Sequence, residues 1–451
     1  MSRTTRWADL LRTLLPRNSA TRLAVGLADQ GLSAGTMFLV NVVLARNQSK
    51  EDYGMFALSY SIFTFLAAIH NAAVLEPFTV YGSGRYRDKY SAYWGLMMSG
   101  NVLIGIVLSA GLFLTYLVFT KVAPMLNSRP LLGLAIALSF LLTGLFVRRS
   151  FYVIQQPTQA AGASLVYFLV VALELWIATK MRLLSGFSVF LILGLSWIVA
   201  GVGLVRELPA GGRPRAFLDS EPRYREEHWK YARWVLVTAF VFQFTHQGYY
   251  WFVGGLLSVK EVGELKAMYM LIAPIEQVMI SLSFLFLPAL AAKYASQNMG
   301  RFLGTWKRYT LLILAITLTF AFAVRVAGSR IVHILYSGKF DGLGPMLFIL
   351  ALVPLVMGIG NTAGDAIKAA EKPRLIFYAY VSSALATFAV GIPLVKFFGL
   401  RGAAWGMIVS AATYSLALLI AFRLRVYGPR LSPVPVAYTA AVDLPPLEGR
   451  L

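Results

Sequence analysis

The chain has 451 residues, of which 58% are hydrophobic and only 14% are charged, and its mean hydropathy is +0.67. This composition excludes an ordinary soluble domain, and apolar runs of about 18 residues or more between short basic segments are typical of a polytopic membrane protein. The net charge of +21 lies in those short segments and there is no Cys, which argues against nucleic-acid binding and excludes disulfides and thiolate metal sites.

The chain begins with a basic, amphipathic stretch, residues 1–22, that includes MSRTTRWADLLRTLLPRN. It has no apolar core followed by a small-residue cleavage site, so we predict a helix lying on the membrane surface and not a removable signal. Twelve apolar runs follow, and they start near residues 23, 53, 91, 131, 159, 186, 231, 264, 309, 344, 375 and 400. Because the runs are continuously apolar, without alternation, they predict an all-α protein and not a β-barrel.

Residues 207–229 form the longest polar interruption and are rich in Gly, Pro and mixed charge. We interpret them as a cytoplasmic linker between two six-helix bundles, residues 23–206 and 230–426. The Pro-rich tail, residues 427–451, is predicted to be disordered. Most of the 41 Lys and Arg residues lie in segments on the same side as the N-terminus, which predicts that both termini are cytoplasmic.

The two halves begin alike, which indicates an internal repeat. Gln30-Gly31 corresponds to Gln247-Gly248, and KEDYG at 50–54 corresponds to KEVGE at 260–264. Both halves start on the same side and have an even number of spans, so the repeat axis runs along the membrane normal. Such halves predict a central cleft and alternating access, although duplication for stability alone gives the same pattern. The KEDYG segment is also explained by helix-start chemistry, with acids at a helix N-terminus and a glycine for close packing.

Three stretches carry a family resemblance: LARNQSKEDYGMFAL after the first span, SVKEVGELKAMY after the seventh and AAEKPRLIF after the tenth. With twelve spans in two halves, the chain resembles the polysaccharide exporter branch of the multidrug/oligosaccharidyl-lipid/polysaccharide (MOP) superfamily, the Wzx-type flippases of O-antigen and exopolysaccharide repeat units.

The resemblance implies a MATE-like fold in the bacterial inner (plasma) membrane. It implies export of a lipid-linked oligosaccharide, carried on undecaprenyl pyrophosphate, for lipopolysaccharide or exopolysaccharide biosynthesis. The expected partners are this lipid-linked oligosaccharide, membrane lipids and polysaccharide assembly proteins. The multidrug extruders of the superfamily also have twelve spans, so a drug/cation antiporter is the alternative.

Polar residues inside the spans are the candidates for a transport pathway and for coupling to an ion, H⁺ or Na⁺. The most central acid is Glu276, beside Pro274, which should kink its helix. Asp365 and Lys368 are spaced for an ion pair, and Asp29 lies within the first span. The candidates are Glu276, Asp29, Gln243, His246, Gln247, Asp365 and Lys368. Hydrogen bonding to neighbouring helices, or snorkelling of the Asp365 and Lys368 pair to the interface, is the alternative interpretation.

Three arginines are candidates for holding phosphate: Arg148 and Arg149 at the end of the fourth span, and Arg325 near the outer end of the ninth. A guanidinium binds phosphate oxygens in pairs, and interface anchoring is the alternative. A membrane polysaccharide polymerase is a less favoured alternative, because the chain has four His and no paired-carboxylate motif in its loops. We therefore expect a protein that is not an enzyme, with no catalytic residue, metal ligand or cofactor.

Overall fold

The computed structural model describes residues 17–124, 127–205, 208, 218, 221 and 223–427, with the backbone alone for 17–23 and 202–205. Most of the predicted N-terminal surface helix, nearly all of the predicted tail and much of the predicted linker lie outside these residues. The described part of the chain is helical and contains no strand, which confirms the all-α prediction.

The first half contains six membrane passes. Two short irregular helices, η1 and η2, interrupt or connect its α-helices. Its helices are α2 (Arg17–Asn47), α3 (Lys50–His70), η1 (Asn71–Leu75), α4 (Glu76–Ser83), η2 (Arg87–Lys89), α5 (Tyr90–Val122), α6 (Arg129–Val153), α7 (Pro157–Lys180) and α8 (Gly186–Val205).

The second half repeats this plan, and the predicted linker is shorter than expected because a helix already begins at Tyr224. Its helices are α10 (Tyr224–Leu256), α11 (Val259–Met270), α12 (Ala273–Ala295), α13 (Met299–Tyr336), α14 (Gly344–Ala369), α15 (Arg374–Ala386), η3 (Thr387–Gly391), α16 (Ile392–Phe422) and η4 (Arg423–Tyr427).

Nine helical segments of the described residues are long and apolar enough to cross a membrane. One of them, Arg374–Tyr427, has 54 residues, more than twice the roughly 20 residues that a bilayer core requires. Gly399 divides it into two passes, because its φ of 59° and ψ of −141° interrupt the helix in a conformation that essentially only glycine adopts. The shorter α8 and the more polar α10 complete the twelve passes.

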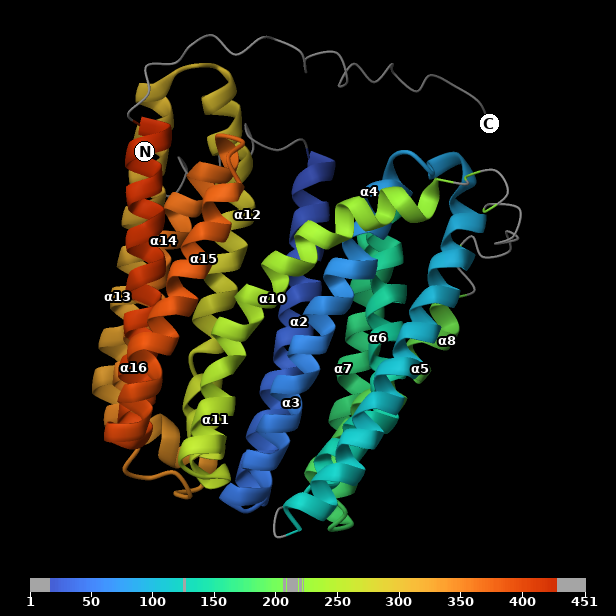
Figure 1. The fold of residues 1–451 in the computed structure, drawn as a ribbon, viewed down its shortest axis with the longest axis vertical. Helices are drawn as coiled ribbons and strands as arrows, with labels where there is room; N and C mark the ends of the chain where they lie inside the picture. The colour runs from blue at the N-terminus through green and yellow to red at the C-terminus, as the bar shows by residue number, and fades with distance from the viewer. Residues whose placement is uncertain are drawn as a thin grey trace.

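Figure 1 shows the two bundles side by side, with the start of α2 and the end of α16 at the top. We call this the terminal face, and we call the other the opposite face, where α2 turns into α3 and α10 turns into α11. The bundles approach each other through α3 and α11 near the opposite face (Figure 1). The long helix α10 crosses from the first half at the terminal face towards the second half at the opposite face.

The charged segments of the repeat are helix starts, and they align one residue away from the predicted register. Ser49 caps α3, and Ser258 caps α11; each side chain accepts a hydrogen bond from the amide three residues on, at 3.0 and 3.4 Å. The equivalent sequences are therefore SKEDYG (49–54) and SVKEVG (258–263), so that Gly54 matches Gly263. The predicted alignment matched the Lys-Glu pairs instead of the capping serines.

Local breaks in the helices place the polar groups of the site. At the predicted Pro274 kink the α-helical hydrogen bonds stop after Met270, whereas Leu271 and Ile272 bond three residues back instead of four, and α12 starts at Ala273 with Pro274 in its first turn. A π-helical turn, η1, interrupts the second pass at Asn71, and another, η3, interrupts the eleventh. Each such turn inserts a residue into the helical ladder and re-aims the side chains around it.

Candidate functional site

The first half contains a cavity of about 450 Å³ on the side of the terminal face. We call it the first-half cavity. Side chains of α2, α3, η1 and α6 form it, with one residue from the second half. Its lining is Gly26, Leu27, Gln30, Ala67, Asn71, Leu75, Leu145, Arg148, Arg149, Tyr152 and Phe284. Both candidate arginines of the fourth pass thus reach one space.

The two arginines have different surroundings. Arg148 is bound to Asp29, which is fully buried: its Nε lies 3.1 and 3.0 Å from the two carboxylate oxygens, and its Nη2 lies 2.6 Å from Oδ2. Tyr152 and Ser164 also donate to the Asp29 carboxylate. Such a buried, fully hydrogen-bonded pair is a structural element, and it joins α2 to α6 and α7.

Arg149 retains donors that no carboxylate occupies. Its Nη2 donates to Asn71 Oδ1 at 3.2 Å, and within the described residues it forms no ion pair. Asn71, the first residue of η1, in turn donates to Glu76 Oε1 at 3.2 Å. The π-helical turn thus aims an amide at the arginine, and the guanidinium faces the cavity with most of its donors available for a second ligand.

The second half contains a cavity of about 470 Å³, the second-half cavity. It collects the predicted residues of three helices: His246 from α10, Glu276 from α12, and Asp365 and Lys368 from α14. The other lining residues are largely aromatic, amide or apolar. They are Phe242, Met279, Ile280, Ser283, Phe284, Tyr309, Ile313, Pro354, Met357, Gly358, Asn361, Gly364, Ile376, Tyr380 and Tyr414.

The predicted pair in α14 is present, because Lys368 Nζ lies 3.3 Å from Asp365 Oδ1. Tyr309 donates to the other carboxylate oxygen at 3.1 Å. Asp365 is buried, whereas about half of the Lys368 side chain is exposed. The carboxylate is therefore held from both sides, and the lysine also lines the cavity.

Glu276 stands in the first turn of α12, where the helix dipole favours a carboxylate. The Tyr269 hydroxyl donates to Glu276 Oε1 at 2.6 Å. The sequence reading missed its second neighbour, Lys266, which is buried with its Nζ 4.5 and 5.4 Å from the ring centroids of Tyr60 and Tyr250. Lys266 lies in the SVKEVGELKAMY stretch, near the predicted start of the eighth run, but it was not among the candidates. Only its place inside a segment rich in Met and Tyr could have indicated a buried position.

Four predicted residues line neither cavity: Asp29, described above, and Gln243, Gln247 and Arg325. Gln243 and Gln247 are one turn apart in α10, at the limit of a hydrogen bond (3.5 Å). Arg325 is exposed on α13, with its guanidinium 5.9 Å from the Phe348 ring. The sequence placed Arg325 by its depth along the helix, which does not determine the face on which a side chain lies.

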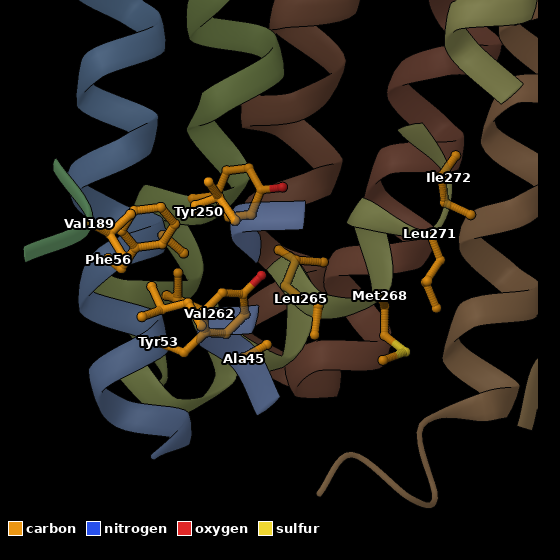
Figure 2. Packing of buried hydrophobic residues seen from close by; sticks show 14 of the residues in the cluster. Ala45, Tyr53, Phe56, Val189, Tyr250, Val262, Leu265, Met268, Leu271 and Ile272 are labelled. Atoms are coloured by element: carbon orange, nitrogen blue, oxygen red, sulfur yellow. The ribbon is translucent and has the colours of Figure 1, made fainter. Parts of the chain in front are cut away.

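The halves meet near the opposite face through the two glycines of the repeat. A Cβ on Gly54 would overlap the Val259 carbonyl, and a Cβ on Gly263 would overlap the Lys50 carbonyl. Lys50 and Val259 each follow their capping serine, so the contact is reciprocal, as expected about a pseudo-two-fold axis. Figure 2 shows Tyr53, Val262 and Leu265 packed beside this crossing.

Polar contacts reinforce this closed face. Lys50 Nζ lies 2.6 Å from Glu264 Oε1 across the two halves. Lys339, in the turn between α13 and α14, donates to the carbonyls at the end of α2: Ala45 (3.2 Å), Arg46 (3.0 Å) and Gln48. A cation is favoured at a helix C-terminus, and burial lowers the pKa of Lys339. The close packing at the glycine was predicted from the sequence, but the Lys50–Glu264 ion pair and the Lys339 contacts were not.

A second contact between the halves lies at the terminal face, ahead of the seventh pass. Glu227 of α10 pairs with Arg85 at 2.8 Å and accepts from the Tyr86 hydroxyl at 3.1 Å. Its neighbour His228 is buried among tyrosines, with Nε2 3.0 Å from the Tyr93 hydroxyl. Burial lowers the pKa of His228 to about 4. We call this contact the terminal latch.

No group of three or more His, Asp or Glu side chains able to hold a metal ion occurs in the described part of the chain. No family model and no curated protein match the sequence. Solved structures do match. One is the inward-facing conformation of a multidrug resistance MATE family transporter of the MOP superfamily, with a TM-score of 0.72 and 12% identity over 90% of this chain and 94% of that one.

The fold is that of MOP superfamily transporters. The lipid II flippase MurJ, in an inward closed conformation, matches with a TM-score of 0.68 and 14% identity over 88% of this chain and 86% of that one. A MOP superfamily transporter from Pyrococcus furiosus matches with a TM-score of 0.66 and 12% identity over 90% and 95%. These neighbours confirm the predicted MATE-like MOP fold and include both extruders and a flippase.

Proposed function

We propose that this protein is a flippase of the bacterial inner membrane. It moves an oligosaccharide repeat unit linked to undecaprenyl pyrophosphate from the inner to the outer leaflet, for surface polysaccharide biosynthesis. The termini are cytoplasmic, so the closed opposite face is periplasmic and the cavities on the terminal side receive substrate from the cytoplasmic leaflet. Alternating access consists of opening the glycine crossing and closing the halves at the terminal face.

One observation carries the choice of an anionic lipid substrate. Arg149 faces the first-half cavity with donors that no carboxylate occupies, whereas Arg148 is neutralised by Asp29. An arginine held in this way within the membrane binds phosphate oxygens in a fixed geometry, and it is too costly to retain as a packing residue. The neighbouring Asn71 amide supplies a further hydrogen-bonding group to the same space.

Coupling to H⁺ or Na⁺ is assigned to Glu276. It stands at a helix break, lines the second-half cavity and has Tyr269 as its hydrogen-bond donor. Discontinuous helices provide such ion sites in transporters. Because Lys266 lies nearby and is buried, loss of the Glu276 charge leaves an uncompensated cation, so ion release and helix packing are coupled at this position.

A drug/cation antiporter is the second candidate, and one observation favours it. The lining of the second-half cavity has two carboxylates, Glu276 and Asp365, against one ammonium group, Lys368. Lys266 lies beside Glu276 but outside the lining, so a cationic ligand meets more carboxylates than ammonium groups there. If the protein is a drug/cation antiporter, Arg149 makes no contact with the substrate. Its substitution would therefore leave transport intact, which separates the two candidates.

The test is complementation in a strain lacking the gene, with surface polysaccharide normalised to membrane protein. We expect Arg149→Gln to reduce export at least tenfold and Arg149→Lys to restore part of it, because lysine keeps the charge without the paired donors. Arg325→Gln, a matched change on the outer surface, should export normally. Full export by Arg149→Gln, or loss of resistance to cationic dyes in the deletion strain with unchanged polysaccharide, would overturn the proposal.

A further inference from the structure

One phenylalanine borders both cavities. Phe284 belongs to α12 of the second half, yet it lines the first-half cavity together with Asn71 and Arg149 as well as the cavity of its own half. Of the described residues, it alone is common to the two linings. Its side chain therefore stands between two spaces of nearly equal volume, about 450 and 470 Å³.

The ring of Phe284 has no aromatic partner. The side chain exposes 50% of its surface, and within the described residues its ring packs on no other ring. Two residues on, Phe286 stacks on Tyr309 with the ring centroids 4.4 Å apart and the planes at 11°. The helix thus packs one phenylalanine and leaves the other with a free face inside a cavity lined by polar groups, which is the setting for stacking against a ligand ring.

The polar groups on the two sides of Phe284 differ in kind. On the first-half side Asp29 occupies Arg148, whereas Arg149 meets its nearest carboxylate, Glu76, only through Asn71, so its guanidinium turns free donors to the cavity. On the second-half side each carboxylate has a cation beside it, Lys368 for Asp365 and Lys266 for Glu276. The remaining polar groups of that cavity are hydroxyls, the Asn361 amide and the His246 ring. A phosphate therefore finds free guanidinium donors in the first space, whereas a neutral group rich in hydroxyls suits the second.

We propose that Phe284 is a specificity-determining residue that receives the first saccharide ring of the substrate. The inference rests on the proposed function and deepens it. Arg149 holds the diphosphate, the C–H face of the adjoining sugar stacks on the Phe284 ring, and the following sugars occupy the second-half cavity. The aromatic face is the negative end of the ring quadrupole and attracts C–H groups. The site therefore selects a diphosphate bonded directly to a sugar over either group alone.

The experiment compares two probes on purified full-length protein in nanodiscs by calorimetric titration. One is farnesyl diphosphate, and the other is farnesyl diphosphate carrying one N-acetylglucosamine. The variants are Phe284→Ala, Phe284→Tyr and, as a matched control, Phe322→Ala; Phe322 is 71% exposed on α13 and lines neither cavity. Because Phe284 is also half-exposed, both alanine changes should leave the melting temperature within about 3 °C of the parent.

The parent should bind the sugar-bearing probe about 5-fold more tightly than farnesyl diphosphate, which is the ratio that one aromatic contact supplies. Phe284→Ala should bring the ratio to about 1 without changing the affinity for farnesyl diphosphate, while Phe284→Tyr and Phe322→Ala keep it. A parent that binds both probes equally, or a Phe284→Ala protein that keeps the ratio, overturns this inference alone. Failure of the parent to bind either probe overturns the proposed function and this inference with it.

Discussion

Two neighbouring arginines show that the groups around a residue determine whether its side chain can bind a ligand. Arg148 and Arg149 have the same chemistry and adjacent positions, but successive helix residues point about 100° apart. One meets the buried Asp29 carboxylate and the other the η1 turn. The first is fixed by the fold, while the second remains available to a ligand. Their substitutions should therefore fail in different ways.

We expect Asp29→Asn and Arg148→Gln each to lower stability by about 3 to 5 kcal/mol, because each leaves one uncompensated charge in the membrane interior. The double variant removes both charges and should recover at least half of the combined loss. The measurement is the fraction of protein that stays monodisperse after heating in detergent. Arg149→Gln is the matched control and should stay close to the parent; losses in the double variant that simply add would contradict the pairing.

The sequence could place Asp29 and Arg148 in the membrane but could not pair them. Hydropathy gives depth, whereas pairing requires knowing which of twelve helices are neighbours and how each is rotated. The same limit applies to Arg325, whose depth could be predicted but whose exposed position on α13 could not. Asp365 and Lys368 were predictable as a pair because one helix carries both, three residues apart, and local geometry then decides.

The glycine contact between α3 and α11 determines how closely two whole helices can approach each other. The backbones of α3 and α11 approach so closely that neither Gly54 nor Gly263 has room for a Cβ. A helix with the same sequence but a larger residue there would have to move outward along its length. Closure of the opposite face therefore depends on these two positions more than on the ion pairs around them, which can adjust.

Gly54→Ala should prevent full closure, although alanine is the better helix former by about 1 kcal/mol. A cysteine at Ala45, which is buried beside the Lys339 contact, should react faster with a water-soluble maleimide in this background. Gly111→Ala, at a position in α5 with open space around it, has the same propensity gain and should leave the labelling rate unchanged. Equal rates in the two backgrounds would show that the crossing tolerates a methyl group.

The terminal latch should be sensitive to pH through His228. Its pKa of about 4 lies below the ordinary 6.5, so the folded latch favours the neutral ring. Stability from this residue is full above pH 6.5 and is lost as the pH falls towards 4. The ring is surrounded by Tyr81, Tyr93 and Tyr224, and the ion pair of Glu227 with Arg85 lies beside it.

We expect hydrogen-exchange protection of the first turns of α10 to fall over this pH range, after correction for the intrinsic rate. His228→Phe keeps an aromatic ring without a titrating group and should flatten the profile. His333→Phe serves as the control, because His333 is exposed on the opposite face beside Asp341. A profile that persists in His228→Phe would assign the pH dependence to another group.

The sequence predicted the architecture of the whole molecule well, because bilayer thickness fixes the length of each apolar run. It missed the early start of α10 at Tyr224, since charged and polar residues form the first turns there and bind the other half instead of the bilayer. It also displaced the repeat by one residue, since the capping serines that define the register carry no hydropathy signal. Contacts between the halves, including Lys266 and Lys339, depend on tertiary packing that a single sequence does not contain.

The orientation of the protein in the membrane can be tested with single cysteines. The protein has no native Cys, so single cysteines report on one face each. Asn47 is exposed at the opposite face and Ser296 is exposed at the terminal face, and each is replaced by Cys in turn. In intact cells an impermeant thiol reagent should label position 47, whereas position 296 should need permeabilisation. The cysteine-free parent gives the background, and the reverse pattern would place the termini outside.

The reciprocal crossing of SKEDYG and SVKEVG bears on how such a chain can arise. Each half contains the same hexapeptide pattern: a capping serine, an acid three residues on and a glycine five residues on. The two copies of the pattern contact each other. A six-helix chain with one copy of the pattern would already make this contact with a second copy of itself. Gene duplication and fusion would then preserve a closed face that the two copies already formed. The two halves could afterwards diverge in their cavities while the glycines were retained.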